Sequence, residues 1–385
     1  MKGKKLVLDD FHLLKKLGSG DIGTVYLVEP KGSTSGCLFA AKVMDKEELA
    51  SRNKEGRARI EREILEMLDH PFLPSLYAIL DCPRWSCLLT EFCPGGDLHI
   101  LRQCQPEKRF QEDAVRFYAS QVVAALEYLH MLGIIYRDLK PENVLVRSDG
   151  HIMLTDFDLS LICTNSSSTA QLIYDDKTHC SDNGNNRDLR RSFISSCIRS
   201  NCDSPSISCF RFGWHKGKKK KNTTEISGYN GTLKIVAEPI NARSMSFVGT
   251  HEYLAPEIVE GDGHGNGVDW WTLGVFIYEL FYGVTPFKGV DNECTLANIV
   301  ARGVEFPDEP MVAPNAKDLM RQLLKKDPKE RMGCTMGASA IKPHSFFHGV
   351  NWSLLRCTKP PYVPMDIVSS IDQCHANANI NIDYY

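Results

Sequence analysis

The sequence predicts an α+β protein in two parts, a strand-rich amino-terminal part and a larger, mainly helical carboxyl-terminal part. Runs of β-branched and aromatic residues, which favour strands, recur over residues 8–92 and leave room for one amphipathic helix at 57–68. After residue 93 the longest patterns are helical, with helical spacing of apolar residues over 112–132 and an almost continuously apolar segment at 273–284. We therefore expect a small sheet with one main helix, followed by a helical core.

The composition is that of an ordinary globular protein. The 385 residues are 43% hydrophobic, and a net charge of −3 provides no overall attraction to nucleic acid or membranes. No apolar segment long enough for a signal peptide follows Met1, and the 273–284 segment is too short to cross a bilayer and contains Glu279. We therefore expect the 14 cysteines to be reduced thiols of a cytoplasmic protein.

Glycines at positions 18, 20 and 23 form a Gly-x-Gly-x-x-Gly motif, which on its own also fits a dinucleotide-binding fold. That fold requires a helix after the glycines, whereas residues 24–28 predict a strand. A glycine-rich hairpin lets backbone amides approach the phosphates of ATP, where side chains would clash. The residues expected to lie against ATP here are Gly18, Ser19, Gly20, Asp21, Ile22, Gly23 and Val25.

Lys42 is the one cation in the apolar strand predicted over residues 38–44. A buried ammonium group requires a partner, and the phosphates of ATP would provide one. A carboxylate on the following helix would provide a second, and both Glu61 and Glu63 are candidates. The alternative is that Glu61 belongs to the solvent-exposed face of that helix.

The most specific chemistry lies in two short segments that each follow an apolar run. Asp138 can orient a hydroxyl group and accept its proton, and Lys140 can neutralise a phosphoryl group during transfer. Asn143 and Asp156 offer oxygen ligands of the kind that Mg²⁺ prefers. These four residues predict phosphoryl transfer, and the alternative is a charged turn followed by a buried strand.

These motifs occur in the order seen in protein kinases, which the chain resembles over about residues 8–355. The resemblance implies a two-lobed kinase fold, with a small antiparallel-sheet lobe that carries one main helix and a larger, mainly helical lobe. The implied segments are an extension at 1–10, the small lobe at 11–92, the large lobe at 93–347 with an insertion at about 164–242, and a tail at 348–385.

The same resemblance implies roles for individual residues. It selects Glu61 as the partner of Lys42, and both count as catalytic alongside Asp138 and Lys140. It implies ATP with two Mg²⁺ ions, for which Mn²⁺ can substitute. The further residues expected to contact ATP are Ala40, Lys42, Thr90, Glu91, Cys93 and Asp97.

Other matched positions concern the protein substrate. Lys140 and Thr250 occur as in kinases that phosphorylate serine and threonine. Asp97, Glu142 and Glu279 match positions that receive basic residues upstream of the target hydroxyl in a related branch. We therefore expect a preference for Arg or Lys two to three residues before the phosphorylated residue, with Thr250 also contacting the substrate.

Four residues are expected to support the large lobe. In the family, the counterpart of Glu257 pairs with that of Arg331, and the counterpart of Asp269 braces the catalytic loop. Ser246 occupies the place of an activating phosphosite, and a phosphate there would pair with Arg137. A plain loop serine is the alternative for Ser246.

Within the kinases, the segments 136–138, 247–250 and 343–352 resemble the AGC superfamily. Asp158, in place of the usual glycine, and the long insertion are typical of the plant-specific AGC kinases that include PINOID. The resemblance implies a Ser/Thr kinase acting on auxin efflux carriers or related polarity targets. Because glycine permits backbone angles that other residues resist, Asp158 also leaves open a pseudokinase scaffold that docks partners through its insertion and tail.

The insertion is polar and poor in periodicity, and we expect most of it to be disordered. Its cysteines fit no standard zinc motif, so free thiols are favoured over a metal site. Three aromatic residues at 210–214 stand among the cations Arg211, Lys216, Lys218, Lys219, Lys220 and Lys221.

This basic run predicts attachment to anionic lipid at the plasma membrane. A solvated charge run and a nuclear-import signal are the alternatives, so a nuclear location stays open. A basic-aromatic module for nucleic acid would explain only this run, and no nucleic-acid partner is expected.

The chain ends in Ile382-Asp383-Tyr384-Tyr385, which looks like a degenerate copy of the Phe-x-x-Phe motif of AGC kinases. That motif docks on the small lobe or recruits the phosphoinositide-dependent kinase, which is the expected upstream partner. The alternative is a frayed terminus. We expect the protein to be a monomer.

Overall fold

The computed structural model describes residues 6–32, 37–163, 171–175, 232–236, 238–239 and 243–364, with the backbone alone for 171–175 and 232–236. The chain falls into two units, Met1–Thr169 with Ala237–Tyr385, and Ala170–Val236, which we describe separately.

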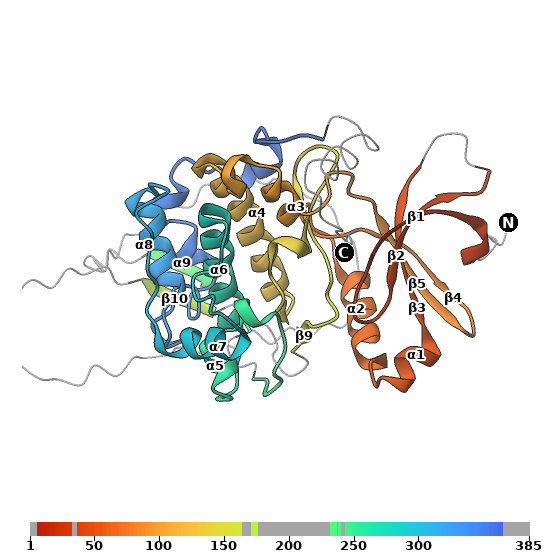
Figure 1. The fold of residues 1–385 in the computed structure, drawn as a ribbon, viewed down its shortest axis with the longest axis horizontal. Coiled ribbons are helices and arrows are strands. Elements are labelled where there is room, and N and C mark those ends of the chain that lie inside the picture. Colours follow the sequence, from red (N-terminus) through yellow and green to blue (C-terminus); the bar gives the residue numbers. More distant parts are fainter. Residues whose placement is uncertain are drawn as a thin grey trace, which may run out of the picture. The chain divides into compact units, whose positions relative to one another are not determined.

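A five-stranded antiparallel sheet forms the small lobe of the first unit (Figure 1). Its strands lie in the order β1-β2-β3-β5-β4. Their bounds are β1 Phe11–Ser19, β2 Thr24–Pro30, β3 Phe39–Asp45, β4 Leu76–Asp81 and β5 Trp85–Glu91. The predicted fold class is confirmed. Because a strand and not a helix follows the glycine motif, the dinucleotide-binding alternative is wrong.

The register of the sheet lines up the residues that the sequence linked to ATP. Val25 on β2 lies opposite Lys42 on β3, and Ala40 on β3 lies opposite Thr90 on β5. Directly opposed residues share a face, as do residues two apart along a strand. All four side chains therefore project from the same face of the sheet.

Helix α2, Glu55–Met67, is the main helix of the small lobe and buries Glu61, Ile64 and Leu65. The buried residues Ile64 and Leu65 share a hydrophobic cluster with Met44 of β3 and Leu88 of β5. The shorter helix α1, Lys46–Ser51, precedes it and is capped by the carboxylate of Asp45. Sequence analysis missed α1, because six residues are too few to show an apolar period.

The large lobe is built around two helices, α4 Glu112–Met131 and α6 Gly267–Tyr282. Helix α6 is buried from Gly267 to Phe281, which explains its mostly apolar sequence. Among the described residues, no helix has the length and apolar character needed to cross a membrane.

The other helices are α3 Leu98–Gln103, α5 Pro256–Val259, α7 Asn292–Ala301, α8 Pro314–Leu323 and α9 Ala338–Ile341. The 3₁₀ helices are η1 Leu8–Asp10, η2 Pro106–Lys108, η3 Pro141–Asn143, η4 His251–Tyr253, η5 Ser345–Phe347 and η6 Trp352–Cys357.

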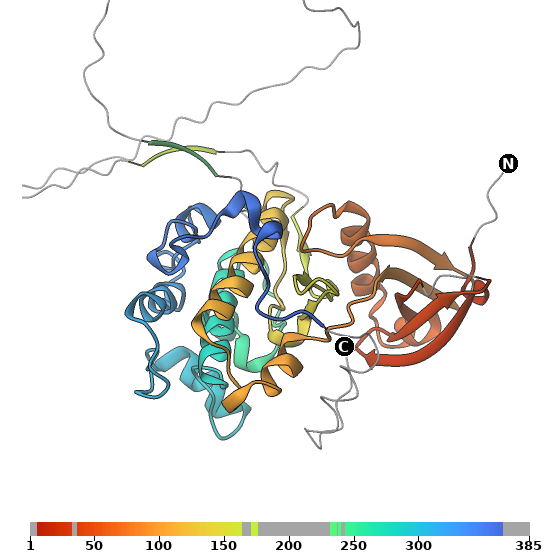
Figure 2. The same ribbon diagram turned by 90° about the horizontal axis from the view of Figure 1, so that it is seen from above.

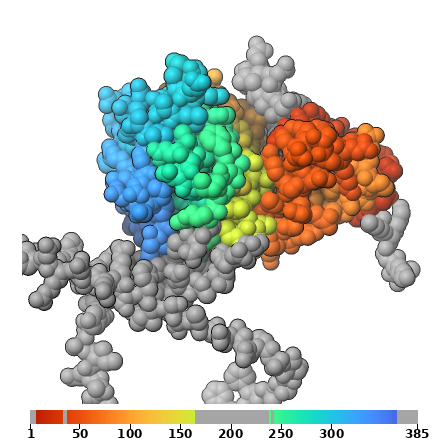
Figure 3. Space-filling view, turned by 90° about the horizontal axis from the view of Figure 1, so that it is seen from below, coloured from red at the N-terminus to blue at the C-terminus, as the bar shows by residue number. Residues whose placement is uncertain are grey.

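Short strands bring the predicted catalytic segments together at the edge of the large lobe. Strand β6 Ile134–Ile135 pairs with β9 Leu161–Ile162, and β7 Val144–Val146 pairs with β8 Ile152–Leu154. The β7–β8 hairpin carries the chain from the end of the catalytic loop to Asp156. In the space-filling view, the yellow segment that ends near residue 163 lies between the two lobes (Figure 3).

The passage between the lobes runs against this hairpin. The backbone N–H of Gly95 donates to the carbonyl of Val146 at 3.0 Å. A Cβ at Gly95 would lie 2.8 Å from that carbonyl oxygen, so the close approach requires glycine. Cγ of Pro364 would lie 2.9 Å from the same Cβ, and the dark blue carboxyl-terminal segment turns back toward the small lobe (Figure 2).

The second unit contains one antiparallel strand pair, β10 Gln171–Asp175 with β11 Thr232–Val236. Sequence analysis did not predict these strands inside the insertion. The basic run at 210–221 and the motif at 382–385 lie outside the described residues.

Candidate active site

One pocket is lined by residues of both lobes. The small lobe contributes Val25, Ala40, Lys42, Glu61, Leu65, Pro74, Leu88, Thr90 and Glu91, and the large lobe contributes Leu145, Met153, Thr155, Asp156 and Phe157. The lining is mostly apolar, with a few charged groups at one end, which is typical of a cofactor site. Cys93 is buried next to this lining, in a cluster with Leu145 and Met153.

Not every residue expected to contact ATP lines this pocket. Gly20 and Gly23 close the glycine-rich turn through an N–H to carbonyl hydrogen bond of 2.9 Å, and a Cβ at Gly23 would lie 2.6 Å from the carbonyl oxygen of Val43. Ile22 is buried in the hydrophobic core and does not line the pocket. Asp97 also lies outside the lining and caps helix α3, accepting the N–H of Ile100 at 2.7 Å.

Lys42 links the two lobes at the charged end of the pocket. Its Nζ lies 2.8 Å from Oε1 of Glu61 on α2 and 2.9 Å from Oδ1 of Asp156. Burial lowers the pKa of Lys42, but the carboxylates of Asp156 and Glu61 raise it by more, so its pKa stands above the usual value. Burial raises the pKa of Glu61 to about 7, and Lys42 offsets only part of this effect. The geometry selects Glu61 over Glu63, because Glu61 is buried and meets Lys42.

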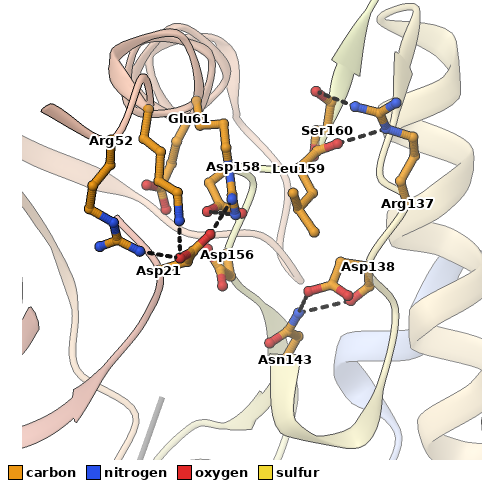
Figure 4. A network of polar contacts seen from close by, with 12 residues as sticks. Asp21, Arg52, Glu61, Arg137, Asp138, Asn143, Asp156, Asp158, Leu159 and Ser160 are labelled. Atoms are coloured by element: carbon orange, nitrogen blue, oxygen red, sulfur yellow. Dashed lines mark hydrogen bonds and ion pairs between the residues drawn. The ribbon is translucent and has the colours of Figure 1, made fainter. Parts of the chain in front are cut away.

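Asp138 is the centre of a second polar network, and Figure 4 shows its contact with Asn143. Its carboxylate accepts hydrogen bonds from Nδ2 of Asn143 at 2.8 Å and from Thr250 Oγ1 at 3.3 Å, and lies 3.0 Å from Nζ of Lys140. Nζ of Lys140 also donates to Oγ1 of Thr250 at 3.0 Å. Burial raises the pKa of Asp138 above its usual value, although Lys140 opposes the shift. The carboxylate is thus held in one orientation by three different side chains.

Asp269 on helix α6 holds the backbone that precedes Asp138. Its two carboxylate oxygens accept the backbone N–H groups of Tyr136 at 2.8 Å and Arg137 at 2.7 Å. Arg137 has a φ of 69°, a conformation that is uncommon outside glycine. These two hydrogen bonds therefore support a strained turn next to the predicted proton acceptor.

Asp158 meets a cation that sequence analysis did not consider. Arg57 of α2 donates hydrogen bonds to Asp158 and to Asp21 of the glycine-rich turn. Asp21 also pairs with Lys54 and with Arg52, the latter at 2.7 Å (Figure 4). Arg57 lies four residues before Glu61, which puts both on one face of the helix, and this spacing was the signal that would have revealed it.

The backbone at position 158 has a conformation that aspartate adopts without strain. Among the described residues other than glycine, φ is positive at Asn53, Glu107, Lys108, Arg137 and Asp156, and position 158 is not among them. The left-handed residue of this segment is Asp156, with a φ of 59°. Burial and the neighbouring charge of Asp156 raise the pKa of Asp158 to about 6, against the effect of Arg57.

The large lobe contains the buried ion pair named in the sequence analysis. Arg331 donates to both carboxylate oxygens of Glu257, at 2.7 and 2.8 Å, and also to the carbonyl of Gly267 at 2.9 Å. The side chain of Arg331 is fully buried. The pair joins helix α5 to the start of helix α6.

Near the expected phosphosite, Arg137 contacts Ser244 and not Ser246. Its Nη1 donates to Oγ of Ser244 at 3.2 Å, and its Nε donates to the carbonyl of Leu159 at 2.7 Å. Ser246 is exposed and lies 3.0 Å from Ser244, oxygen to oxygen. A phosphate on Ser246 would therefore have to reach Arg137 past Ser244.

The acidic residues expected to bind the substrate differ in how far their carboxylates are exposed to solvent. Glu279 is buried, accepting hydrogen bonds from Tyr253 and from Arg102, the latter at 2.8 Å. Glu142 lies 3.2 Å from Nδ1 of His99 and keeps 47% of its side chain exposed. Burial raises the pKa of Asp97 to about 7. Of the three, Glu142 offers the most accessible carboxylate.

The two residues predicted to hold a divalent cation, Asn143 and Asp156, lie at the two ends of the β7–β8 hairpin. The backbone N–H of Thr155, the residue before Asp156, donates to the carbonyl of Asn143 at 3.0 Å, and 33% of the Asp156 side chain is exposed. No group of three or more His, Cys, Asp or Glu side chains able to hold a metal occurs among the described residues. One carboxylate and one carboxamide fit a hard cation whose other ligands are phosphate oxygens and water.

The family model described as "Protein kinase domain" matches residues 11–180 and 230–347. Serine/threonine-protein kinase AGC1-5 of Arabidopsis thaliana is 52% identical over 366 residues, covering 94% of this chain and 61% of its own length. Serine/threonine-protein kinase AGC1-7 of the same plant is 52% identical over 379 residues, covering 98% and 67%. Serine/threonine-protein kinase KIPK2, also of this plant, is 54% identical over 364 residues, covering 93% and 38%. The chain thus spans about three fifths of the length of the AGC1-5 kinase.

Proposed function

Because this chain belongs to the protein kinase family, and within it to the plant AGC kinases, we propose that it transfers the γ-phosphoryl group of MgATP to serine or threonine of protein substrates. One observation carries the proposal. Lys42 of the small lobe and Asp156 of the large lobe approach within 2.9 Å at the charged end of one pocket. Protein kinases require such a pair to converge on the phosphates and the metal ion.

The residues present fit ATP and a divalent cation. An apolar pocket with Ala40 and Thr90 on one wall suits a flat base, and the ammonium of Lys42 suits phosphate. The cation would be held by Asn143 and Asp156, and we propose Mg²⁺ because all the ligands are oxygen atoms. When bound, it would neutralise charge on the phosphates.

Asp138 and Lys140 are the proposed residues of transfer. The carboxylate of Asp138 would accept a hydrogen bond from the substrate hydroxyl and take its proton, while Asn143 and Thr250 hold it in place. Lys140 would supply positive charge beside the transferred group. Its present contacts with Asp138 and Thr250 keep that charge next to the reacting hydroxyl.

The proposed substrates carry arginine or lysine upstream of the target residue. The exposed carboxylate of Glu142 supports this, since it can accept hydrogen bonds from a guanidinium group. Resemblance to the PINOID group extends the proposal to auxin efflux carriers. We further propose that the phosphoinositide-dependent kinase activates the protein and that the basic run attaches it to the plasma membrane. We also propose that the protein is a monomer.

A pseudokinase scaffold is disfavoured by the surroundings of Asp158. This residue needs no left-handed backbone and has Arg57 as its counter-charge, while every residue proposed for transfer is present.

The test is ATP turnover on a basic peptide by the wild-type protein and by Asp138→Asn. We expect turnover by the wild type and a loss of at least about a hundredfold in the variant. A folded wild type that binds MgATP but phosphorylates no basic peptide or protein would overturn the proposal.

A further inference from the structure

Glu238, just after strand β11 in the chain, is buried against the large lobe. Its Oε2 accepts hydrogen bonds from Nδ1 of His130 and from Nδ2 of Asn266, each at 2.8 Å, and its side chain is 3% exposed. His130 belongs to the last turn of helix α4, and Asn266 immediately precedes helix α6. Where the insertion ends, the chain is therefore attached to both central helices.

The carboxylate of Glu238 occupies space that is left because residue 337 is a glycine. A Cβ added at Gly337 would overlap Oε1 of Glu238, and Gly337 has a positive φ of 56°. The ring of His130 is fully buried and packs edge-on against Trp270, with ring centroids 4.9 Å apart. Glu238 and Trp270 thus hold the imidazole of His130 in place.

The second nitrogen of His130 leads to the catalytic loop. Its Nε2 lies 2.8 Å from Oδ2 of Asp269. The same Asp269 accepts the backbone N–H groups of Tyr136 and Arg137, directly before Asp138. Three consecutive contacts therefore connect Glu238 to the backbone that carries the proposed proton acceptor.

We propose that Glu238 is a positioning residue for phosphoryl transfer: through His130 and Asp269 it holds the catalytic loop in its transfer-competent conformation. The end of the insertion is then part of the support of the active site. This inference rests on the proposed kinase function.

The charges in this chain of contacts make the role measurable. Burial lowers the pKa of His130, but Glu238 and Asp269 together raise it to about 10. The ring therefore carries a positive charge at neutral pH and donates from both nitrogens. Besides Glu238 and Asp269, the group described in contact with the ring is the indole of Trp270, which does not titrate.

Replacing Glu238 removes one of the two charges that keep His130 protonated. The pKa of His130 must then fall. The imidazole therefore loses its proton at a lower pH, and Asp269 loses a charged partner. The variant Glu238→Gln keeps the shape of the side chain and one acceptor oxygen, and it removes the negative charge. Glu293→Gln, on the exposed start of helix α7, is the matched control.

The experiment measures kcat and the KM values for a basic peptide and for ATP between pH 6.5 and 9.5 in the full-length wild type, Glu238→Gln, Glu238→Asp and Glu293→Gln. We expect Glu238→Gln to lower kcat by about tenfold or more at neutral pH and KM for ATP to stay within about twofold. We also expect its kcat to decline further as pH rises, with partial recovery in Glu238→Asp and no change in Glu293→Gln.

Two readouts do not depend on activity. The pKa of His130, followed by NMR of labelled histidine, should be lower in Glu238→Gln, and the amides of Tyr136 and Arg137 should exchange with solvent faster. An inactive wild type would contradict the kinase function, while these readouts would still test the contacts. A folded Glu238→Gln with unchanged kcat, pH profile and amide exchange would overturn the inference.

Discussion

The guanidinium group of Arg57 donates a hydrogen bond to the carboxylate of Asp158, the residue that replaces the glycine found in most kinases. The same guanidinium group contacts Asp21 in the glycine-rich turn. One cation on helix α2 therefore connects the turn above the pocket to the segment that carries Asp156. Asp158, which replaces the usual glycine, and Asp21 thus have Arg57 as a common partner.

Removal of Arg57 should impair transfer. In Arg57→Ala, the buried carboxylate of Asp158 remains beside that of Asp156 without this cation, and we expect kcat/KM to fall about tenfold, or about 1.4 kcal/mol in the barrier. Asp158→Gly should make the protein less sensitive to the loss of Arg57, with a coupling energy of about 1–3 kcal/mol. Kinase assays on the double-mutant cycle measure this, with the exposed Arg59→Ala as control. Strictly additive effects would contradict the shared partnership.

Glu257→Ala should destabilise the large lobe. It leaves the fully buried guanidinium of Arg331 without its carboxylate, which typically costs about 3–5 kcal/mol in unfolding free energy. Lys288→Ala, which breaks the more exposed pair with Glu252, should cost less than about 1 kcal/mol. Denaturant unfolding monitored by tryptophan fluorescence measures both, and equal effects of the two substitutions would count against the prediction.

Ser246→Ala should abolish activation by an upstream kinase. A phosphate on Ser246 would bring about two negative charges toward Arg137, which Ser244 now contacts. We expect Ser244→Ala to retain activation, because it removes a weak contact and leaves the phosphosite. Mass spectrometry locates the phosphate, and kinase assays before and after treatment measure the response. Full activation of Ser246→Ala would exclude this role.

Glu142→Gln should reduce the preference for basic peptides. Burial opposes it, but His99 holds the pKa of Glu142 below its usual value, so the carboxylate is charged at neutral pH. We expect KM to rise about tenfold for a peptide with arginine two or three residues upstream, equivalent to about 1.4 kcal/mol. KM should change little for a peptide with alanine there. Peptide arrays that show indifference to upstream arginine in the wild type would refute the substrate class.

Binding of the basic run to membranes can be tested directly, although residues 210–221 lie outside the described residues. Glutamine at Lys216 and at 218–221 should lower binding to phosphatidylserine or phosphoinositide vesicles by about 1 kcal/mol per residue. Wild-type binding should weaken as salt is added, since the attraction is electrostatic. Cosedimentation measures both, and absent or salt-insensitive binding would contradict lipid attachment.

Much of the fold follows from local patterns in the sequence. The β-branched residues after Gly23 predict strand β2, and the apolar spacing around Ile64 predicts helix α2. The continuous apolar run of α6 predicts a fully buried helix. Helix α1 was not predicted because six residues provide too little helical periodicity, and the β10–β11 pair was not predicted because the polar insertion that contains it favours disorder.

By itself, the sequence determined the two-part α+β architecture and the types of residue available for phosphoryl transfer, because strand and helix periods and turn chemistry act over a few neighbouring positions. Only the tertiary structure decided which charges meet. Arg57 and Asp158 are 101 positions apart, and His130 and Glu238 are 108 positions apart. A local pattern reports which face of an element is buried, whereas the partner of a buried charge depends on how distant elements pack against one another.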